Sequence, residues 1–427
     1  MSKPKSFAKI QRNTLRLSIC TIALLCAVGN VPPAQAQTFS VIHTFTGGSD
    51  GWWPYAGLTI DQGGNLYGTT SEFSSGNAGT AFEMRLRNGF WTFTTLSDFS
   101  GRSTARVPQG RLIVGPGGAL YGTTLYGGND TCFEFGCGSV YALRPPRTVC
   151  RSSNCEWSDS PVFGFPGNGT LGWGPQLVDP AFDAAGNLYG TTQYGGSSGN
   201  GNVFELTRVG GVWNGVNIHS FNVTDGFFPQ NGVTLDAEGN VYGPIWQGGS
   251  GGWGAIFELT NTGGGWSETA LYNFQCGDDG GLPSTALIFD HAGNLYGATE
   301  RCGSGGGGTV FELSPSGSGW TYNVLYSFVG PQWGGPVAAL MMDASGNLYG
   351  TTVQQGAFGY GTVFKLTRNN GSWTYTDLHD FTNGDDGAYP ISEVVMDASG
   401  NLYGTASQGG DLSACSGGCG TVWKIAP

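Results

Sequence analysis

Apolar and polar positions alternate most clearly in residues 336–381. Residues 336–342 form a short apolar run, which predicts a buried strand, here strand A. Residues 343–347 read DASGN and predict a tight turn, because Asp accepts hydrogen bonds from turn backbone while Gly and Asn tolerate positive φ. Residues 348–352 read LYGTT and predict strand B.

Two further strands follow. Residues 361–366 alternate apolar and polar side chains and predict strand C. Residues 369–371 (NNG) predict a second turn, and residues 373–381 alternate again as strand D. Four short strands joined by turns are typical of one β-propeller blade.

The pattern recurs along the chain at a nearly fixed period. Successive copies of its tyrosine are 54, 68, 53, 54, 53 and 54 residues apart. Such a period indicates a repeat architecture, so we predict an all-β fold, a seven-bladed β-propeller with four antiparallel strands per blade. The alternative is a β-solenoid, although the coils of a parallel β-helix are usually much shorter. The tyrosines are Tyr67, Tyr121, Tyr189, Tyr242, Tyr296, Tyr349 and Tyr403.

The two ends of the repeat region complete each other. Residues 420–425 match strand C of the seventh repeat, and no strand D follows them. Residues 38–45 match strand D, as in residues 374–381, so the first segment is expected to supply the missing strand and close the ring. Gln37 stands where strand D otherwise has Trp.

Strand D carries a Trp and a Phe at a constant offset of eight residues. Because an even offset keeps side chains on one face of a regular strand, we expect both rings to face the same neighbouring blade. The pairs are Trp91/Phe99, Trp157/Phe165, Trp213/Phe221, Trp266/Phe274, Trp320/Phe328 and Trp373/Phe381.

Residues 1–36 predict a secretory signal peptide. Five basic residues precede an apolar run over about residues 17–28, and Ala34 and Ala36 form an A-x-A cleavage site. Residues 37–427 are then one propeller domain of seven repeats, secreted to the periplasm or the cell exterior. No other apolar run is long enough to span a membrane.

Charge narrows the classes of partner. Loss of the five basic residues of the signal leaves 13 basic residues against 30 acidic ones, a net charge of −17. An acidic surface argues against nucleic acid and anionic membranes. It favours neutral ligands or cations, with a carbohydrate or protein as the partner, and a monomer is expected.

Eight cysteines remain after the signal, an even count that predicts disulfides in an exported chain. Metal ligation is the alternative, but no CxxC pair supports it. Cys276 and Cys302 fall in loops at the same end of one blade, so we predict that they bond. The disulfide candidates are Cys132, Cys137, Cys150, Cys155, Cys276, Cys302, Cys415 and Cys419.

The motif D-x-x-G-N-L-Y-G-T-T, followed by a Gly-Gly loop and G-T-V-F-[EK]-L, resembles the GloVer (Gloeobacter/Verrucomicrobia-type) tandem repeat of exported bacterial proteins. The resemblance covers residues 38–427 and implies no established enzymatic activity. Family members often end in a cell-envelope anchor; residues up to Pro427 show no such tail, so anchoring is not expected here. The A–B hairpins are also similar to those of NHL-like propellers, some of which are extracellular lyases or hydrolases.

Ligand-binding candidates lie in the B–C and D–A loops, which share the variable end of the blades. Six tryptophans there suit stacking on sugars or peptides, and the alternative is that they fill gaps between Gly-rich loops. Four Asp-Gly aspartates could bind Ca²⁺ around the axis, and the alternative is an ordinary turn. No other cofactor is expected. The candidates are Trp52, Trp53, Trp173, Trp246, Trp253, Trp333, Asp50, Asp225, Asp279 and Asp386.

Other polar residues recur with the repeat and are interpreted as structural. His43, His219 and His379 share one strand-D position, and no catalytic triad can be assembled. We therefore predict a non-catalytic secreted scaffold that binds a ligand or partner, in the most specific version a glycan, on the face formed by the B–C and D–A loops. The alternatives are an extracellular propeller lyase or hydrolase and a structural cell-envelope protein. Four strand-C acids also recur with the repeat and are interpreted as structural, namely Glu83, Glu205, Glu258 and Glu312.

Overall fold

The computed structural model divides the chain into two units, Met1–Ala36 and Gln37–Pro427. Besides Met1, it describes residues 37–71, 78–99, 105–128, 135–146, 157–167, 169–317, 319–369 and 371–427. The predicted signal peptide, Met1 apart, lies outside the described residues. The fold described below is that of the second unit.

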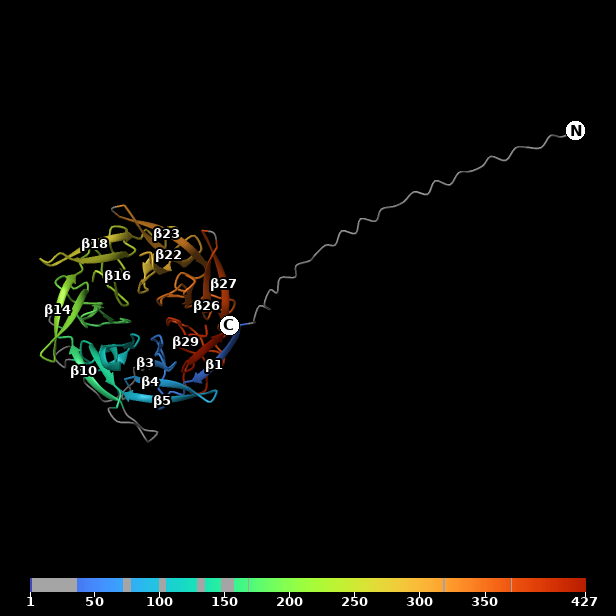
Figure 1. Cartoon of the computed structure of the whole chain (residues 1–427), viewed down its shortest axis with the longest axis horizontal. Coiled ribbons are helices and arrows are strands. Elements are labelled where there is room, and N and C mark those ends of the chain that lie inside the picture. The colour runs from blue at the N-terminus through green and yellow to red at the C-terminus, as the bar shows by residue number, and fades with distance from the viewer. Residues whose placement is uncertain are drawn as a thin grey trace. The chain divides into compact units, whose positions relative to one another are not determined.

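Seven antiparallel sheets follow one another around a central axis (Figure 1). Consecutive strands pair within each sheet, with strand A innermost and strand D outermost. The predicted seven-bladed β-propeller with four antiparallel strands per blade is confirmed, and the β-solenoid alternative is wrong. In the part of the chain that the structure describes, the one helical element is a short 3-10 turn, η1 (Pro116–Gly118).

The first three blades contain the following strands A to D. Blade one has β2 (Thr59–Ile60), β3 (Leu66–Thr70), β4 (Thr80–Arg87) and β5 (Phe90–Asp98). Blade two has β7 (Ile113–Val114), β8 (Leu120–Tyr126), β9 (Ser139–Arg144) and β10 (Ser158–Gly164), with an extra strand β6 (Arg106–Pro108) beside β8. Blade three has β11 (Ala181–Phe182), β12 (Leu188–Thr192), β13 (Asn202–Val209) and β14 (Val212–Ser220).

The next three blades repeat this order. Blade four has β15 (Thr234–Leu235), β16 (Val241–Ile245), β17 (Ala255–Asn261) and β18 (Trp266–Asn273). Blade five has β20 (Ile288–Phe289), β21 (Leu295–Arg301), β22 (Gly306–Ser316) and β23 (Gly319–Val329), with an extra strand β19 (Gly281–Pro283) beside β21. Blade six has β24 (Met341–Met342), β25 (Leu348–Thr352), β26 (Thr362–Asn369) and β27 (Ser372–Asp380).

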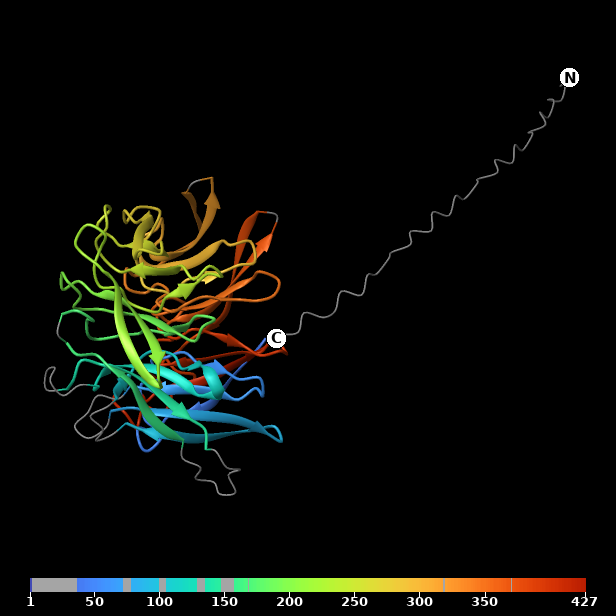
Figure 2. The same ribbon diagram turned by 60° about the vertical axis from the view of Figure 1, so that its left-hand side comes forward.

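Blade seven joins the two ends of the repeat region. It combines β28 (Val395–Met396), β29 (Leu402–Ala406) and β30 (Thr421–Ala426) with β1 (Thr38–Thr44). The register runs from Thr38 opposite Ala426 to Thr44 opposite Thr421, and the blue strand lies beside the red ones in Figures 1 and 2. The predicted closure is confirmed, and it pairs strand edges that would otherwise stay open.

Strand A is much shorter than its apolar run predicts. In blade six only Met341 and Met342 pair with β25, at Tyr349 and Leu348. The preceding Val337, Ala338 and Ala339 line a cavity on the axis. The apolar run therefore lines the axial cavity with its first residues and forms strand A with its last two.

A β-bulge in strand D overturns the expected orientation of the Trp and Phe rings. In β27 the register shifts past Leu378, between Asp377 and His379. One extra residue reverses the alternation of faces. Trp373 consequently packs with Tyr296 of blade five, whereas Phe381 packs with Trp423 of blade seven. The two rings face opposite neighbours and join three consecutive blades.

The repeated A–B turn is held by its aspartate. Asp343 Oδ1 accepts the backbone N–H groups of Ser345 and Asn347, both at 2.9 Å. Its Oδ2 accepts the Asn347 side-chain amide at 2.7 Å and the Tyr349 hydroxyl at 3.1 Å. The motif therefore builds the turn that its Asp, Gly and Asn residues predict, and it also anchors a buried tyrosine ring.

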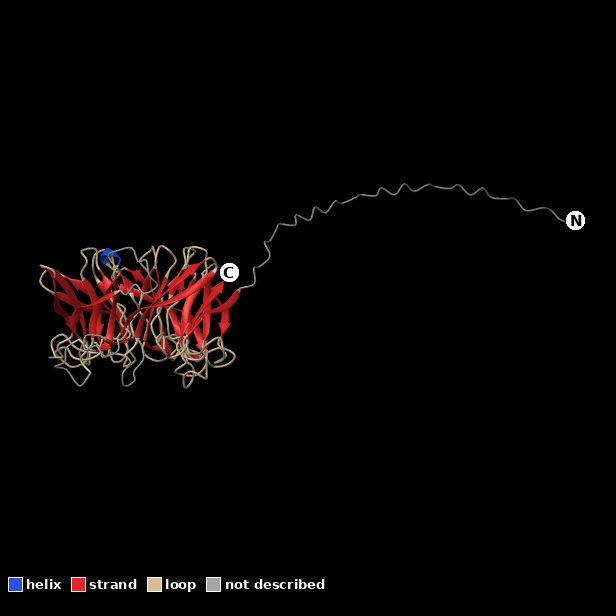
Figure 3. Ribbon diagram, turned by 90° about the horizontal axis from the view of Figure 1, so that it is seen from below, coloured by secondary structure: helices blue, strands red, loops and turns tan. Residues whose placement is uncertain are grey.

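The two ends of the blades differ in form. In Figure 3, one edge of the ring carries short turns, including η1, and the other carries longer loops. The short turns are the A–B and C–D connections, and the longer loops are the B–C and D–A connections. No helix in the described ranges is long and apolar enough to cross a membrane.

Candidate functional site

A cavity of about 360 Å³ lies on the axis and is lined by residues from all seven blades. Most of them come from the end of a D–A loop, just before strand A. Pockets of this size that combine apolar walls with a few polar groups are the usual sites for small ligands. It is therefore the principal candidate site.

One wall of the cavity carries charge at a position where most blades have none. Four residues before the A–B turn, four blades have a small residue, namely Gly57, Gly232, Ala286 and Ala339. Blades two, three and seven instead have Arg111, Asp179 and Glu393. All three line the cavity, and we call them the charged wall.

The charged wall is an ion-paired group. Arg111 Nε lies 2.9 Å from Glu393 Oε1 and 3.4 Å from Asp179 Oδ2. The Arg111 backbone N–H donates to Asp179 Oδ1 at 2.6 Å. A Cβ added at Gly57 would lie 2.8 Å from Glu393 Cγ, so a glycine in the intervening blade leaves room for the ion pair.

Burial and neighbouring charges both shift the pKa values of Glu393 and Arg111. Burial raises the pKa of Glu393 well above its usual range, the neighbouring Asp179 raises it further, and Arg111 only partly offsets both. Burial disfavours the charged guanidinium, but Glu393 and Asp179 together raise the pKa of Arg111. The wall thus keeps a permanent cation beside a carboxyl group that holds its proton to higher pH than usual.

Blades four, five and six provide a different wall, made of Trp246, Glu300 and Trp333. Trp246 Nε1 donates to Glu300 Oε2 at 3.4 Å. The guanidinium of Arg301 lies over the ring of Trp333, a cation–π contact. Burial raises the pKa of Glu300, against the Trp246 hydrogen bond and the charge of Arg301. We call this group the aromatic wall.

Amide side chains also contribute to the cavity lining. Gln109, Gln176, Gln230 and Asn231 all line the cavity. Gln109 Oε1 and Asn231 Nδ2 are buried atoms without a hydrogen-bond partner among the described residues. An acceptor and a donor left open in this way suit a polar ligand.

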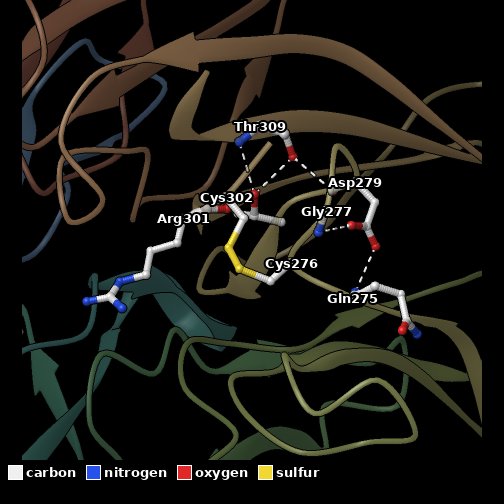
Figure 4. The surroundings of a disulfide bond; sticks show 8 residues. Gln275, Cys276, Gly277, Asp279, Arg301, Cys302 and Thr309 are labelled. Carbon is white, nitrogen blue, oxygen red and sulfur yellow. Dashed lines mark hydrogen bonds between the residues drawn. A yellow bond between two sulfur atoms is a disulfide. The ribbon is translucent and has the colours of Figure 1, made fainter. Parts of the chain in front are cut away.

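A disulfide lies beside Arg301, the residue whose guanidinium covers Trp333 (Figure 4). Cys276 of a D–A loop bonds Cys302 of the following B–C loop, with Cα atoms 5.1 Å apart. The predicted bond is confirmed, and it fixes the end of the segment that carries Glu300 and Arg301. Cys415 bonds Cys419. Cys137 is also disulfide-bonded, whereas Cys132, Cys150 and Cys155 lie outside the described residues.

The six loop tryptophans divide into three groups. Trp246 and Trp333 line the cavity. Trp52 and Trp173 pack against core clusters, with Trp52 stacked on Trp53 at 4.6 Å and Trp173 on Tyr194 at 4.3 Å. Trp253 is 37% exposed and lies outside the cavity lining. Only the first pair therefore contributes to the cavity, whereas Trp52, Trp53 and Trp173 pack on other rings.

The four D–A aspartates lie outside the cavity lining and hold their own loops. Asp386 Oδ2 lies 3.0 Å from His379 Nε2 and accepts the Thr382 backbone N–H at 3.0 Å. Asp279 accepts the Gln275 and Gly277 backbone N–H groups (Figure 4). Their hydrogen bonds are those of turn residues. The equivalent contacts are His43–Asp50 at 3.3 Å and His219–Asp225 at 3.1 Å.

The strand-C acids have a structural partner. Glu312 Oε1 accepts the Tyr296 hydroxyl at 2.8 Å, and Glu258 Oε1 accepts the Tyr242 hydroxyl at 2.7 Å. Glu83 and Glu205 repeat the contact in blades one and three. In the described part of the chain, no group of three or more His, Cys, Asp or Glu side chains is arranged to hold a metal ion.

Sequence reasoning did not select Glu300 or the four amides as candidates, and it missed the charged wall. Each member of the charged wall is a single charge in a short apolar run, which looks like an irregularity when its repeat is read alone. Comparing the seven copies at the fourth position before the turn would have found them, because small residues occupy the other four copies.

The fold and the cavity define a seven-bladed β-propeller with a ligand-sized axial pocket at its variable end. The chain belongs to the Gloeobacter/Verrucomicrobia repeat family, whose sequence profile matches residues 30–158 and 175–423. No curated protein matches the chain significantly.

Solved structures show the same fold at low sequence identity. One is the extracellular domain of a candidate one-component system from B. thetaiotaomicron, with 14% identity, a TM-score of 0.51 and coverage of 92% of this chain and 42% of that one. A candidate 6-phosphogluconolactonase from Bacteroides fragilis has 15% identity, a TM-score of 0.50 and coverage of 80% and 88%. A candidate gluconolactonase has 15% identity, a TM-score of 0.40 and coverage of 74% and 87%. The first two likenesses concern the fold alone.

Proposed function

We propose that this protein is an exported, non-catalytic propeller that binds a saccharide in its axial cavity. The observation that carries the proposal is the pairing of two unlike walls around about 360 Å³. Sugar rings offer an apolar face that stacks on indole and a rim of hydroxyls that bonds to planar polar groups. The aromatic wall suits the first, and the charged wall with its amides suits the second.

Export is supported by the disulfides. The Cys276–Cys302 and Cys415–Cys419 bonds form in oxidising compartments and are rare in the cytosol. The basic and apolar pattern of residues 1–36 agrees with secretion. A saccharide-binding protein outside the cytoplasm would meet envelope or environmental polysaccharides.

The test is calorimetric titration with a panel of soluble oligosaccharides from envelope and plant polysaccharides. Trp333→Ala is expected to weaken binding about tenfold or more, as for loss of a stacked aromatic contact. Trp253→Ala is the matched control, because Trp253 is also an exposed tryptophan of a variable loop but lies outside the cavity lining. No binding by any saccharide, or equal loss in both variants, would contradict the proposal.

A hydrolase is the second candidate, favoured by the contact between Asp179 and Glu393. A carboxyl group whose pKa is raised, in contact with a second carboxyl group, is an arrangement that acid–base catalysis uses. Prolonged incubation with each saccharide that binds, followed by product analysis, separates the two functions. Cleavage that disappears in Glu393→Gln would establish the hydrolase; intact saccharide would exclude it for that ligand.

A further inference from the structure

One acid of the cavity stands apart from the ion-paired group. Asp179 and Glu393 share Arg111, whereas Glu300 forms no salt bridge in the described part of the chain. The nearby guanidinium of Arg301 is directed over the Trp333 ring instead. Glu300 therefore brings to the cavity a carboxylate that is influenced by the charge of Arg301 but forms no salt bridge with it in the described residues.

The surroundings of Glu300 are aromatic. The Trp246 indole N–H donates to Glu300 Oε2 and orients the carboxylate, and within the described residues Oε1 accepts no hydrogen bond. The Trp246 and Trp333 rings line the same cavity. A cation gains from both features, because a carboxylate offers a charge-assisted hydrogen bond and aromatic rings attract positive charge through their faces.

The charge of the whole cavity points the same way. Its lining contains three acids, Asp179, Glu300 and Glu393, and one basic residue, Arg111. Arg111 already contacts two of the acids and the guanidinium of Arg301 lies over Trp333, so an anionic ligand would meet Glu300 without an unpaired basic residue in the lining. Neutral and cationic ligands are favoured over anionic ones.

From these observations we propose that the saccharide bound in the axial cavity is an amino sugar. Its ammonium group donates to the carboxylate of Glu300 between Trp246 and Trp333, and its ring hydroxyls face the amides and the charged wall. This inference rests on the proposed saccharide function and specifies the ligand class for the same cavity.

The experiment compares tetramers of glucosamine, N-acetylglucosamine and glucose by calorimetry at one pH and low salt. The N-acetylglucosamine tetramer keeps the nitrogen of glucosamine but lacks its positive charge. The glucose tetramer has a hydroxyl group in place of the nitrogen. The glucosamine tetramer is expected to bind at least about tenfold more tightly than either neutral tetramer, the factor for one charge-assisted hydrogen bond.

Glu300→Gln should reduce that preference to about twofold or less, because the amide can still accept from Trp246 but carries no charge. Glu238→Gln is the control with the same change in net charge, since Glu238 is exposed on an A–B turn at the opposite end of blade four. Trp246→Phe provides a second variant that removes the orienting hydrogen bond and leaves Glu300 in place. Melting temperatures confirm that each variant is folded.

The outcomes separate the two proposals. Equal binding of all three tetramers would overturn the amino-sugar inference and leave saccharide binding intact. Binding of none would remove the proposed function and the inference together. Putrescine, a diamine without a sugar ring, would overturn the inference if it bound as tightly as the glucosamine tetramer. A preference that survives in Glu300→Gln would also overturn it.

Discussion

The A–B turn keeps nearly the same sequence from blade to blade, whereas the residues at the axial end of the blades differ. At the A–B turn, Asp397 accepts from Asn401 and Tyr403 just as Asp343 accepts from Asn347 and Tyr349. At the axial end of the same blades, one position holds Ala339 in blade six and Glu393 in blade seven. Repetition marks what every blade needs in order to fold, and departures from it gather around one cavity.

The comparison also explains why a recurrent motif carries little functional information. A turn that anchors a buried tyrosine stabilises any blade in the same way, so seven copies agree. A ligand on the axis meets each blade once, and each blade can therefore contribute a different side chain. Variants at the turn end should change stability and leave binding unchanged, and variants at the axis should do the reverse.

The largest expected effect is at the ring that joins blades six and seven. Phe381 is fully buried, so Phe381→Ala should lower the free energy of unfolding by about 3–5 kcal/mol. Trp373 on the same strand is only half-buried and should cost about half as much on truncation. Urea denaturation measures both. Equal losses would contradict the assignment of the two rings to opposite faces.

Removal of the Cys276–Cys302 bond comes next. In the chain-entropy model, a cross-link with a sequence separation of 26 contributes roughly 3.5 kcal/mol. Replacing both cysteines by serine should lower stability by up to that amount and also weaken binding, because the bond fixes the segment that carries Glu300. The corresponding change at Cys415 and Cys419, which close a separation of 4, is the control. Unchanged binding in the first variant would show that Glu300 is held without the disulfide.

Loss of one turn aspartate should have a smaller effect. Asp343→Ala leaves two backbone N–H groups and the Tyr349 hydroxyl without their acceptor, which should cost about 1–3 kcal/mol. Blade two forms this turn with Gly115 in place of the aspartate, so the fold is expected to survive. Thermal unfolding and saccharide titration test the variant together. If the variant folds but binds saccharide more weakly, the claim that the turn end affects stability and not binding would be wrong.

The smallest effect concerns pH. The pKa of Glu393 is higher in the folded protein than in the unfolded chain, so the folded state holds more protons between the two values. Stability from this group should therefore fall as pH rises from the unfolded value, near 4.3, toward the folded one, by at most about 1.4 kcal/mol per pH unit. Glu393→Gln should remove this slope, and Glu238→Gln should keep it. Identical slopes of stability against pH in the two variants would show that a group other than Glu393 titrates.

The sequence predicts the fold well because each blade repeats the same local physics. The turn at Asp343, the alternating strands and the match between residues 38–45 and strand D were sufficient to predict blade number and closure. The lining of the candidate cavity was predicted only in part. Trp246 and Trp333 line the cavity as their loop positions suggest, but the other four loop tryptophans lie outside its lining.

Two features could not be read from single repeats. The bulge at Leu378 depends on pairing between strands C and D, so an even Trp–Phe offset misleads. The contact of Arg111 with Glu393 joins residues on blades two and seven, which only the closed ring brings together. Both depend on tertiary geometry and not on local pattern.

Hydrogen-exchange mass spectrometry with the glucosamine tetramer tests the central claim most directly, namely that the ligand is bound where the blades differ. Protection is expected in peptides that contain Arg111, Asp179, Glu300 and Glu393. The A–B turns at Asp343 and Asp397 should exchange at the same rate with and without saccharide. Protection confined to those turns, with the axial peptides unchanged, would contradict the account.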